Sequence, residues 1–541
     1  MLALPDHLVI VPILLPLVTG AFLLLFDERR RTLKATVSMA ATLALAVIAF
    51  ILLSLADMED AAPGARASVY LLGNWPAPFG IVLVLDRLSA LMLVMTSLLA
   101  VASLVFALAR WHKGGPHFHT LFQFLLMGLN GAFLTGDLFN LFVFFEVLLA
   151  ASYGLLLHGS GALRVRTGLH YIAINLAASF LFLIGVSLIY GMSGTLNMAD
   201  LAVRIAAVPP HDRALLEAGI AILGIAFLVK AGMWPLCFWL PGAYAAAAAP
   251  VAAIFAVLSK VGVYAILRLS PLVLGAGAGA SSGLADTWLL IGGIATIAFG
   301  AIGVLASQAM GRLAAFSVLV SSGTLLTAVG LADIAVTAGA LFYMVSSTLT
   351  IGALFLLVEL VERAQDPAAN VLAVTMEAYG DGDEEEIEEE VGVAIPGTLA
   401  MLGVCFGLLG ILLAGLPPLS GFIGKFALLS AVVGTGDEGS LSMITWAFLT
   451  LVILSGLFAT IAMMRAGIRI FWAPVEGVVP RVLLLEFIPV AFLLLLCAAM
   501  TVQAGPLMRY ADATARSLHA PAAYIGGVLS AQPVPPPEGN R

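Results

Sequence analysis

Long apolar runs, separated by short polar turns, follow one another along nearly the whole chain. A helix needs about 20 mainly apolar residues to cross the hydrocarbon core of a bilayer, and these runs reach that length. They are rich in Leu and Ala and lack the polar alternation of the roughly ten-residue strands of membrane barrels. The pattern predicts an all-α integral membrane protein with about 14 transmembrane helices, near residues 8–26, 33–55, 81–108, 117–135, 138–157, 168–191, 213–233, 248–269, 286–307, 312–332, 334–361, 396–433, 441–472 and 481–504.

Composition agrees with this pattern. Of 541 residues, 62% are apolar and only 10% are charged, with a mean hydropathy of +1.09, whereas a soluble domain is about a quarter charged. Ten of the 32 acidic residues lie between Asp366 and Glu390, in a segment without Lys or Arg, so the net charge of −8 comes from one loop. We expect this loop, residues 364–395, to be solvated and disordered. No basic cluster indicates a nucleic-acid partner.

The distribution of Lys and Arg predicts an orientation. With the N-terminus outside, 13 of these residues fall on the inner side of the expected spans and eight on the outer side. Because cytoplasmic loops carry the excess of positive charge, this favours both termini outside and the acidic loop in the cytoplasm. The first apolar run has no basic residue before it and an Arg cluster after it. That is the reverse of a cleaved signal peptide, and we expect the run to remain as an anchor.

Two segments broken by proline interrupt the apolar pattern: AGMWPLCFWL, which begins at Ala231, and AGLPPLSGFI, which begins at Ala414. At an offset of 183 residues, Gly232 and Pro235 match Gly415 and Pro418, and the flanking residues match as well. Paired interruptions in the two halves of a transporter expose backbone groups to an ion path. We therefore predict two broken helices at Pro235 and Pro418; two chance proline kinks are the alternative.

Three lysines have no loop in which to lie. Lys230 ends the span before the first break, Lys260 lies in the middle of the next span, and Lys425 follows the second break. A charge at the bilayer centre costs at least about 2.5 to 3.5 kcal/mol, so we expect these side chains to face the bundle interior; snorkelling to the interface is the alternative. Glu146, in LFVFFEVLLA, is the one carboxylate deep within an early span, and we expect it to be the counter-ion of Lys230.

These four charges suggest a proton-translocating element. A lysine held out of water can exchange its proton at neutral pH, and a nearby carboxylate favours the charged form. A closed pair of Glu146 and Lys230 then lets Lys260 keep its proton, and an open pair repels that proton onward. We predict that protons move through Glu146, Lys230, Lys260 and Lys425; a static, protonated Glu146 is the competing interpretation.

Hydroxyl and amide side chains recur at helical spacing in the same spans. They can order water between the charges, although Ser and Thr are also routine helix-packing residues in membranes. His170 lies at the mouth of a span, where a role in proton entry competes with that of an ordinary interfacial histidine. The expected supporting residues are Tyr171, Asn175, Ser179, His170, Ser317, Ser321, Thr324, Ser346 and Ser347, with Tyr343 and Thr350 on the same face as Ser347.

Three long motifs carry a resemblance to a known family. They are GDLFNLFVFFEVLLAASYGLL (136–156), LVKAGMWPLCFWLPGAYAAAAAPVAAIFAVLSKVGVYAILRL (228–269) and LAGLPPLSGFIGKFALL (413–429). The chain resembles the antiporter-type membrane subunits shared by Mrp (Pha) multisubunit cation/proton antiporters and the proton-pumping arm of respiratory complex I. The D-type subunits of the Mrp antiporters are the most similar branch, and the resemblance covers nearly the whole chain.

The resemblance implies 14 helices with two inverted five-helix repeats, each containing a broken helix. It implies a division into residues 1–110 (helices 1–3), 117–269 (first repeat, helices 4–8), 286–472 (second repeat, helices 9–13, with the acidic loop) and 481–541 (last helix and tail). It assigns the same roles to the four charges: Glu146 is similar to the family's glutamate of the fifth span, Lys230 to its partner, Lys260 to the central relay lysine and Lys425 to the residue of the broken twelfth span.

One departure concerns the eleventh span, where many family members carry His and Lys. Here Ser346, Ser347 and Ile351 stand at what look like the matching places. The central relay is therefore short of titratable groups. We expect waters held by the Ser and Thr side chains to bridge Lys260 toward Lys425.

The resemblance implies a secondary transporter rather than an enzyme: a multi-pass subunit in a bacterial inner membrane, moving H⁺ in exchange for Na⁺ or K⁺ with other membrane subunits and lipid around it. A proton-pumping subunit of a complex I-like NADH dehydrogenase and a non-transporting scaffold are the alternatives. No cofactor or metal is expected, because no phosphate loop, dinucleotide motif or paired Cys or His ligands are present. Cys237, Cys405 and Cys497 are isolated in apolar runs and form no disulfide framework.

Overall fold

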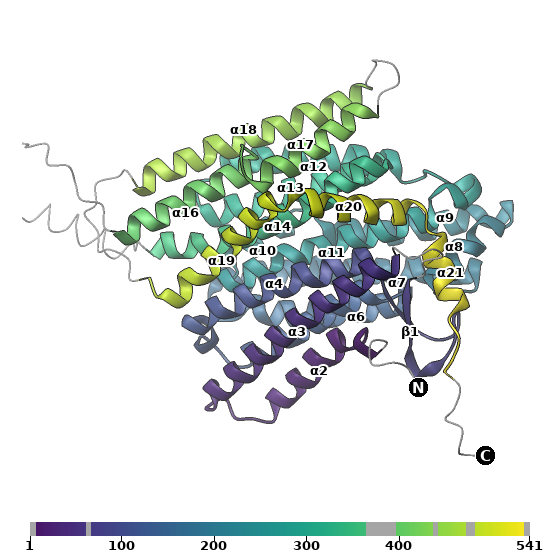
Figure 1. The fold of residues 1–541 in the computed structure, drawn as a ribbon, viewed down its shortest axis with the longest axis horizontal. Coiled ribbons are helices and arrows are strands. Elements are labelled where there is room, and N and C mark those ends of the chain that lie inside the picture. The colour runs from purple at the N-terminus through teal and green to yellow at the C-terminus, as the bar shows by residue number, and fades with distance from the viewer. Residues whose placement is uncertain (1–6, 61–66, 364–396, 436–441, 472–481, 535–541) are drawn as a thin grey trace, which may run out of the picture.

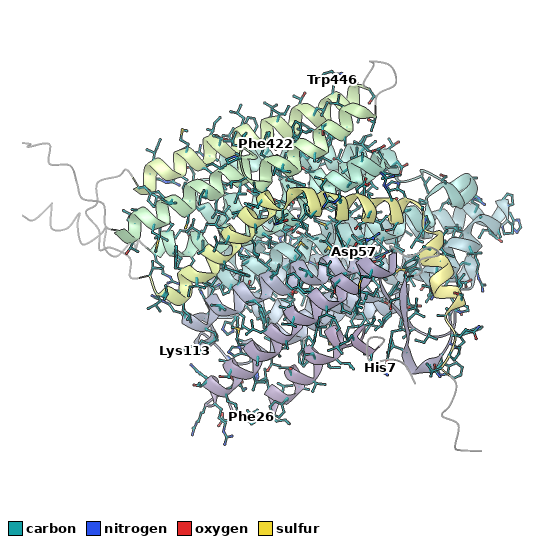
Figure 2. The ribbon with its side chains drawn as sticks, viewed as in Figure 1. His7, Phe26, Asp57, Lys113, Phe422 and Trp446 are labelled. Carbon is teal, nitrogen blue, oxygen red and sulfur yellow. The ribbon has the colours of Figure 1, made fainter. Side chains whose placement is uncertain are left out.

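The computed structural model is a bundle of helices that lie roughly side by side (Figure 1). It describes residues 7–60, 67–363, 397–435, 442–471 and 482–534. The acidic loop expected at 364–395 lies outside the described residues. Apolar side chains cover the outer faces of the helices, and Trp446, which is 58% exposed, points away from the bundle (Figure 2). Such a surface suits contact with lipid.

The N-terminal part contains one shorter helix, two long helices and one small sheet. The helices are α2 (Val11–Leu24), α3 (Arg31–Asp60) and α4 (Arg87–Ala109). Between α3 and α4, strand β1 (Ser68–Leu71) pairs antiparallel with β2 (Val82–Leu85). The expected start of the third span at residue 81 is therefore wrong. The helix begins only at Arg87, because the Asp86 carboxylate accepts a hydrogen bond from the backbone N–H of Ser89 and caps it.

The middle of the chain forms two sets of helices. The first set is α5 (Phe118–Leu134), α6 (Leu138–Leu156), α7 (Ala162–Ser193), the short α8 (Met198–Arg204), α9 (Pro210–Ala231), α10 (Trp239–Ala246) and α11 (Ala249–Val273). The second set is α12 (Asp286–Ala306), α13 (Met310–Gly330), α14 (Ile334–Glu362), α16 (Gly397–Ala414), α17 (Ser420–Gly434) and α18 (Met443–Phe471). Helix α11 is buried along its whole apolar length, so it lies at the centre of the bundle.

Twelve helices of the described residues are long and apolar enough to cross a membrane, and α2, α5 and α17 are shorter apolar helices. With α9 and α10 taken as one broken span, and α16 and α17 as another, the described helices account for each expected segment. The all-α membrane fold is therefore confirmed. The small sheet near the start of α4 is a local addition to it.

The two breaks have the same backbone geometry. Helix α9 is followed by Gly232 with φ of 75°, and α16 is followed by Gly415 with φ of 76°. This left-handed conformation favours glycine because it has no Cβ. Pro235 and Pro418 lie in the connecting segments, as expected. The chain runs from α9 to α10 in the opposite direction to its path from α16 to α17 (Figure 1), which fits two inverted repeats.

The C-terminal part continues beyond the last expected span. After α19 (Leu484–Val502) come α20 (Ala504–His519) and α21 (Ala522–Ser530), where the sequence indicated only a tail. Helix α20 packs along α14, and its His519 Nε2 lies 3.0 Å from Thr337 Oγ1.

The two described ends of the chain both lie near the small sheet. The Val534 carbonyl accepts a hydrogen bond of 2.9 Å from Asn74, and the ring centres of His7 and Tyr70 lie 5.8 Å apart. Both described ends of the chain are therefore on the same side of the bundle.

Candidate ion-translocation site

The three lysines without a loop lie inside the bundle. Lys230 is 8% exposed, Lys260 0% and Lys425 8%. They come from three different elements, the last turn of α9, the middle of α11 and the first half of α17. All three side chains are thus buried within the bundle, where the sequence places them.

Glu146 and Lys230 face each other across α6 and α9 without forming a direct pair. Their charges interact, but among the described residues no ion pair within 4.0 Å joins them. The Glu146 carboxylate instead accepts a hydrogen bond from Ser179 Oγ. The Lys230 ammonium lies 5.0 Å from the centre of the Phe145 ring, within cation–π range. In this structure the two side chains are therefore near enough for their charges to interact but do not form an ion pair.

The expected stripe on α7 forms a connected set of contacts. Tyr171 Oη lies 2.6 Å from Ser152 Oγ, and Asn175 Nδ2 donates to the Tyr171 carbonyl at 2.9 Å. Ser179 also donates to the Asn175 carbonyl, at 3.1 Å. The stripe thus leads along α7 to Glu146. His170 is exposed and points away from this set, which favours the interpretation of His170 as an interfacial histidine.

Lys260 contacts a serine that the sequence stripe did not include. Its Nζ lies 3.4 Å from Ser322 Oγ, a long hydrogen bond, and Ser322 is fully buried on α13. The expected stripe of Ser317, Ser321 and Thr324 lies on another face of the same helix. The sequence indicates Ser322 only as the neighbour of Ser321 in SVLVSSGTLL. Helical periodicity alone does not predict which of these two serines contacts Lys260.

Ser321 points toward α14 instead. Its Oγ lies 2.9 Å from Ser347 Oγ, and the Tyr343 hydroxyl interacts with both Ser321 and Thr324. Two consecutive residues of α13 therefore face different neighbours, Ser322 toward Lys260 and Ser321 toward Ser347. Helix α13 therefore presents one hydroxyl to the central lysine and another to α14.

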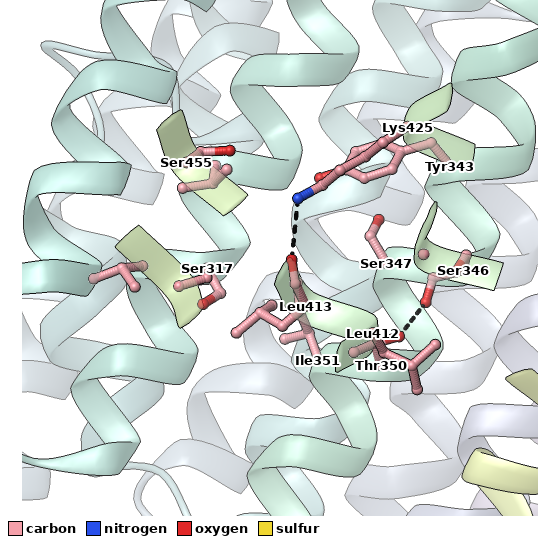
Figure 3. Close-up of a pocket in the computed structure, with 14 residues that line it drawn as sticks. Ser317, Tyr343, Ser346, Ser347, Thr350, Ile351, Leu412, Leu413, Lys425 and Ser455 are labelled. Atoms are coloured by element: carbon pink, nitrogen blue, oxygen red, sulfur yellow. Dashed lines mark hydrogen bonds between the residues drawn. The ribbon is translucent and has the colours of Figure 1, made fainter. Parts of the chain in front are cut away.

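A small cavity of about 30 Å³ lies beside Lys425 (Figure 3). A water needs roughly 10 to 15 Å³ of such space, so the cavity has room for two waters. Its polar lining residues come from α13, α14, α17 and α18: Ser317, Tyr343, Ser346, Ser347, Thr350, Lys425 and Ser455. The expected hydroxyl residues among them, which lie on two different helices, meet only through tertiary packing. Ser455, which also lines the cavity, was missed because it is an isolated serine within an apolar span.

The Lys425 ammonium is held by backbone carbonyls. Its Nζ donates to the carbonyl oxygen of Leu413 at 3.1 Å and to that of Ala414 at 2.9 Å. Ser346, Ser347 and Ile351, the positions at which the chain departs from many family members, all line the same cavity. Ser346 Oγ also lies 2.9 Å from Ser420 Oγ at the start of α17. Two hydroxyl side chains and one aliphatic side chain therefore stand at these three positions of the wall around Lys425.

Comparison with known proteins places this arrangement in a family. The family model described as NADH:quinone oxidoreductase/Mrp antiporter, TM, matches residues 135–457, which include all four charged residues of the site. The chain belongs to this family. Among relatives, it is 65% identical over 530 residues to the D subunit of a probable K(+)/H(+) antiporter of Rhizobium meliloti (strain 1021), covering 97% of this chain and 98% of the relative. It is 34% identical to the D subunit of a Na(+)/H(+) antiporter of Bacillus subtilis (strain 168), covering 97% and 99%.

Solved structures of the family have the same fold. A chain in the structure of the Mrp complex from Dietzia sp. DQ12-45-1b superimposes with a TM-score of 0.82 at 26% identity, covering 98% of this chain and 100% of that one. A chain of respiratory complex I from Thermus thermophilus superimposes with a TM-score of 0.71 at 25% identity, covering 94% and 99%. Both branches of the NADH:quinone oxidoreductase/Mrp antiporter family thus share the bundle described here.

Proposed function

We propose that this chain is the proton-translocating subunit of a multisubunit Na⁺(K⁺)/H⁺ antiporter, in which protons move along Glu146, Lys230, Lys260 and Lys425 and are coupled to alkali cation extrusion. The observation that carries the proposal is the set of three lysines, each at most 8% exposed, within one bundle. Burying such charges is expensive, and a chain that only had to fill the membrane would gain nothing from them.

The contacts suggest how protons pass. The open arrangement of Glu146 and Lys230 leaves the positive charge of Lys230 less compensated than a closed pair would, so it repels a proton on Lys260. Water carries that proton from Lys260, whose Nζ contacts Ser322, to the hydroxyls of Ser321 and Ser347, and the cavity leads from there to Lys425. Closure of the pair lets Lys260 take up the next proton.

The proposal includes the place of the chain in the cell. It is a multi-pass subunit of a bacterial inner membrane, with lipid and other subunits of the antiporter around it and both termini outside. The two repeats span residues 117–269 and 286–472, between the N-terminal helices (1–110) and the last helix with its tail (481–541). The shared side of the two described ends and the excess of Lys and Arg on the opposite side support this orientation.

Two other functions compete with the antiporter. A complex I-like proton pump shares the fold, but the high identity to a protein named as a K(+)/H(+) antiporter component favours the antiporter. A scaffold requires no buried lysines. The energy of an antiporter comes from a gradient, worth about 2.3 kcal/mol per charge per 100 mV.

The test is cation-dependent proton exchange in inverted vesicles that contain the full gene cluster, with wild type compared to Lys260→Ala at matched subunit levels. We expect at least a tenfold loss of Na⁺- or K⁺-driven proton movement in an assembled complex. Lys113→Ala is the matched control, because Lys113 is exposed at the end of the bundle. Unchanged exchange in Lys260→Ala would indicate a scaffold, and NADH-driven pumping without cation exchange would indicate the complex I function.

A further inference from the structure

The N-terminal ends of α6 and α8 are joined by a short backbone bridge. Asp137 and Asn197 pair at its centre, and a hydrogen bond of 2.9 Å lies on each side of them. The C-terminal helix α21 lies beside α8 and β1 at the same end of the bundle (Figure 1). In the proposed orientation this is the outer end. Asp137 is therefore surrounded by segments that are far apart in the sequence.

The two loops of the bridge have similar sequences, TGDLFN (135–140) and TLNMAD (195–200). In each loop the third residue caps the helix that follows. Asp137 Oδ1 accepts a hydrogen bond of 2.8 Å from one backbone N–H, and Asn197 Oδ1 accepts two of 3.1 Å. Asn and Asp are about equally good helix caps. Capping by itself therefore does not require a carboxylate at position 137.

The Asp137 carboxylate has no cationic partner. Among the described residues no ion pair includes it. The arginines of the surrounding elements are paired with other aspartates: Arg268 of α11 with Asp86, and Arg204 of α8 with Asp200. Burial raises the pKa of the Asp137 carboxyl. A carboxylate held from water without a counter-charge binds a proton more readily than one in solution.

Two polar atoms of the second loop are buried beside this carboxylate without a hydrogen-bond partner among the described residues. They are Asn197 Nδ2 and Thr195 Oγ1, from side chains that are 0% and 3% exposed. Buried polar groups are rarely left unpaired in proteins, and such atoms are where an ordered water binds. The bridge thus offers water a place next to a carboxyl that can bind a proton.

The other ionisable groups around Asp137 keep one charge state near neutral pH. The charge of Asp137 acts on Tyr524 of α21, whose Oη lies 3.3 Å from the place of a Cβ on Gly136. Tyr264 of α11 is the second phenol, and phenols ionise only near about pH 10. The remaining groups are the two closed ion pairs. A proton taken up here near neutral pH therefore binds to Asp137.

Tyr264 links this end of the bundle to the central lysine. It follows Lys260 by one turn of α11, so the two side chains lie on the same face of the helix. Its Oη donates to the Phe133 carbonyl oxygen at 2.5 Å, in the last turn of α5. Thr135 comes two residues later, and its Oγ1 accepts a hydrogen bond of 3.2 Å from the backbone N–H of Asp137. Polar groups therefore follow one another from the N-terminus of α6 to the middle of α11.

We propose that Asp137 is the residue through which protons from outside enter the path to Lys260. The inference rests on the proposed function and deepens it, because it adds the outer end of the proton path. Asp137 binds one proton from outside and becomes neutral. The proton then passes along Thr135 and Tyr264 to the neutral amine of Lys260. Asp137 is left as a carboxylate, ready for the next proton.

Asp333 provides a matched comparison. It caps α14 in the same way, with its Oδ1 2.9 Å from the backbone nitrogen of Val336. Its charge acts on a potential cation, His519 of α20, which faces it at the same end of the bundle. The two aspartates thus share the capping role. The unpaired setting beside Tyr264 belongs to Asp137.

The test measures cation-driven proton exchange in inverted vesicles that contain the full gene cluster. Their lumen corresponds to the outside of the cell, so the luminal pH is varied while the bath pH stays fixed. Asp137→Asn keeps the cap but cannot bind the proton, and we expect at least tenfold slower exchange at matched subunit levels. Asp137→Glu keeps a carboxyl and should restore at least about a third of the wild-type rate.

Asp333→Asn is the control and should exchange like wild type. The ratio of the wild-type rate to the Asp137→Asn rate should change with luminal pH, whereas the ratio to the Asp333→Asn rate should stay constant. The Tm of the solubilised complex should be the same in both Asn variants, because both caps remain. Equal exchange in the two Asn variants, whether fast or slow, would overturn the inference. If Asp137→Asn does not assemble, Asp137→Ser, which also caps without a charge, decides by the same criterion.

The outcome is separable from that of the proposed function. Slow exchange in Lys260→Ala with wild-type exchange in Asp137→Asn would leave the proton path standing and overturn the outer entry. Slow exchange in Asp137→Asn with unchanged exchange in Lys260→Ala would support proton uptake at Asp137 and overturn the path through Lys260.

Discussion

The Leu413 carbonyl oxygen lies 3.1 Å from Lys425 Nζ, and this contact shows how the two halves differ. Leu413 stands 183 residues after Lys230, so the positions correspond in the repeat. In the first half the lysine belongs to the helix that ends at the break, whereas in the second half it comes from the helix that begins after the break. One geometric motif, a broken helix with a positive charge beside it, is thus formed from opposite sides of the interruption.

Filling the cavity should stop transport. Ser347→Leu and Ser317→Leu each place a bulky apolar side chain in a space of about 30 Å³ that has room for two waters. We expect exchange in inverted vesicles to fall at least tenfold, because the route from Lys260 to Lys425 loses its waters. Ser430→Leu, at an exposed position of α17, is the control. Full exchange in both cavity variants would contradict the water relay.

Removing the hydroxyl beside the central lysine is a milder test. Ser322→Ala takes away the one side-chain partner that the structure shows for Lys260 Nζ, at 3.4 Å, without adding bulk. A long hydrogen bond contributes little, so we expect exchange to fall about three- to tenfold, measured as initial rates of cation-driven proton movement. Ser187→Ala, on an exposed face of α7, should not change the rate. Equal rates in the two variants would remove Ser322 from the path.

Neutralising Glu146 should remove its charge interaction with Lys230 and slow exchange through the first repeat. Glu146→Gln keeps an oxygen that accepts from Ser179 but loses the charge that acts on Lys230. We expect at least tenfold slower exchange with normal assembly, measured as initial rates against subunit levels in the membrane. The comparison variant is Glu217→Gln, whose carboxylate lies 2.7 Å from Ser281 Oγ in the N-terminal half of α9. A rate in Glu146→Gln that matches wild type would favour the static, protonated role.

The ion pair between Asp86 and Arg268 should support stability rather than transport. It joins the cap of α4 to the C-terminal end of α11, and the two side chains are only 12% and 7% exposed. Burial raises the pKa of the Asp86 carboxyl, but the charge and hydrogen bonds of Arg268 outweigh this, so the pKa lies below its usual value. The stabilisation is therefore present at neutral pH and is lost only as pH falls through that lowered pKa.

Asp86→Asn leaves the guanidinium buried without its counter-charge. We expect a loss of about 3 to 5 kcal/mol in the free energy of unfolding, measured as a lower Tm of the detergent-solubilised complex. Asp57→Asn removes a 57% exposed carboxylate that pairs with the 11% exposed Arg87, and its expected cost is below about 1 kcal/mol. Similar Tm values for the two variants would show that the buried pair contributes no more than a surface one.

The sequence by itself determined the class of fold, the approximate spans, the two breaks and the burial of Lys230, Lys260 and Lys425. Those features follow from the sequence because hydropathy sums along the chain and decides which segments leave water. The isolated Lys260 in an unbroken apolar run already implied an interior position, and Gly232 and Gly415 marked the broken ends by their matching contexts.

Tertiary structure alone decided which groups meet. Ser321 and Ser322 are neighbours in sequence, yet the rotation of α13 in the bundle sends one toward Ser347 and the other toward Lys260. Helix α20 packs on α14 although its own composition is too polar to indicate a span. The carbonyls that hold Lys425 have no sequence signature at all, because every residue carries a carbonyl and only the break leaves these two without a helical donor.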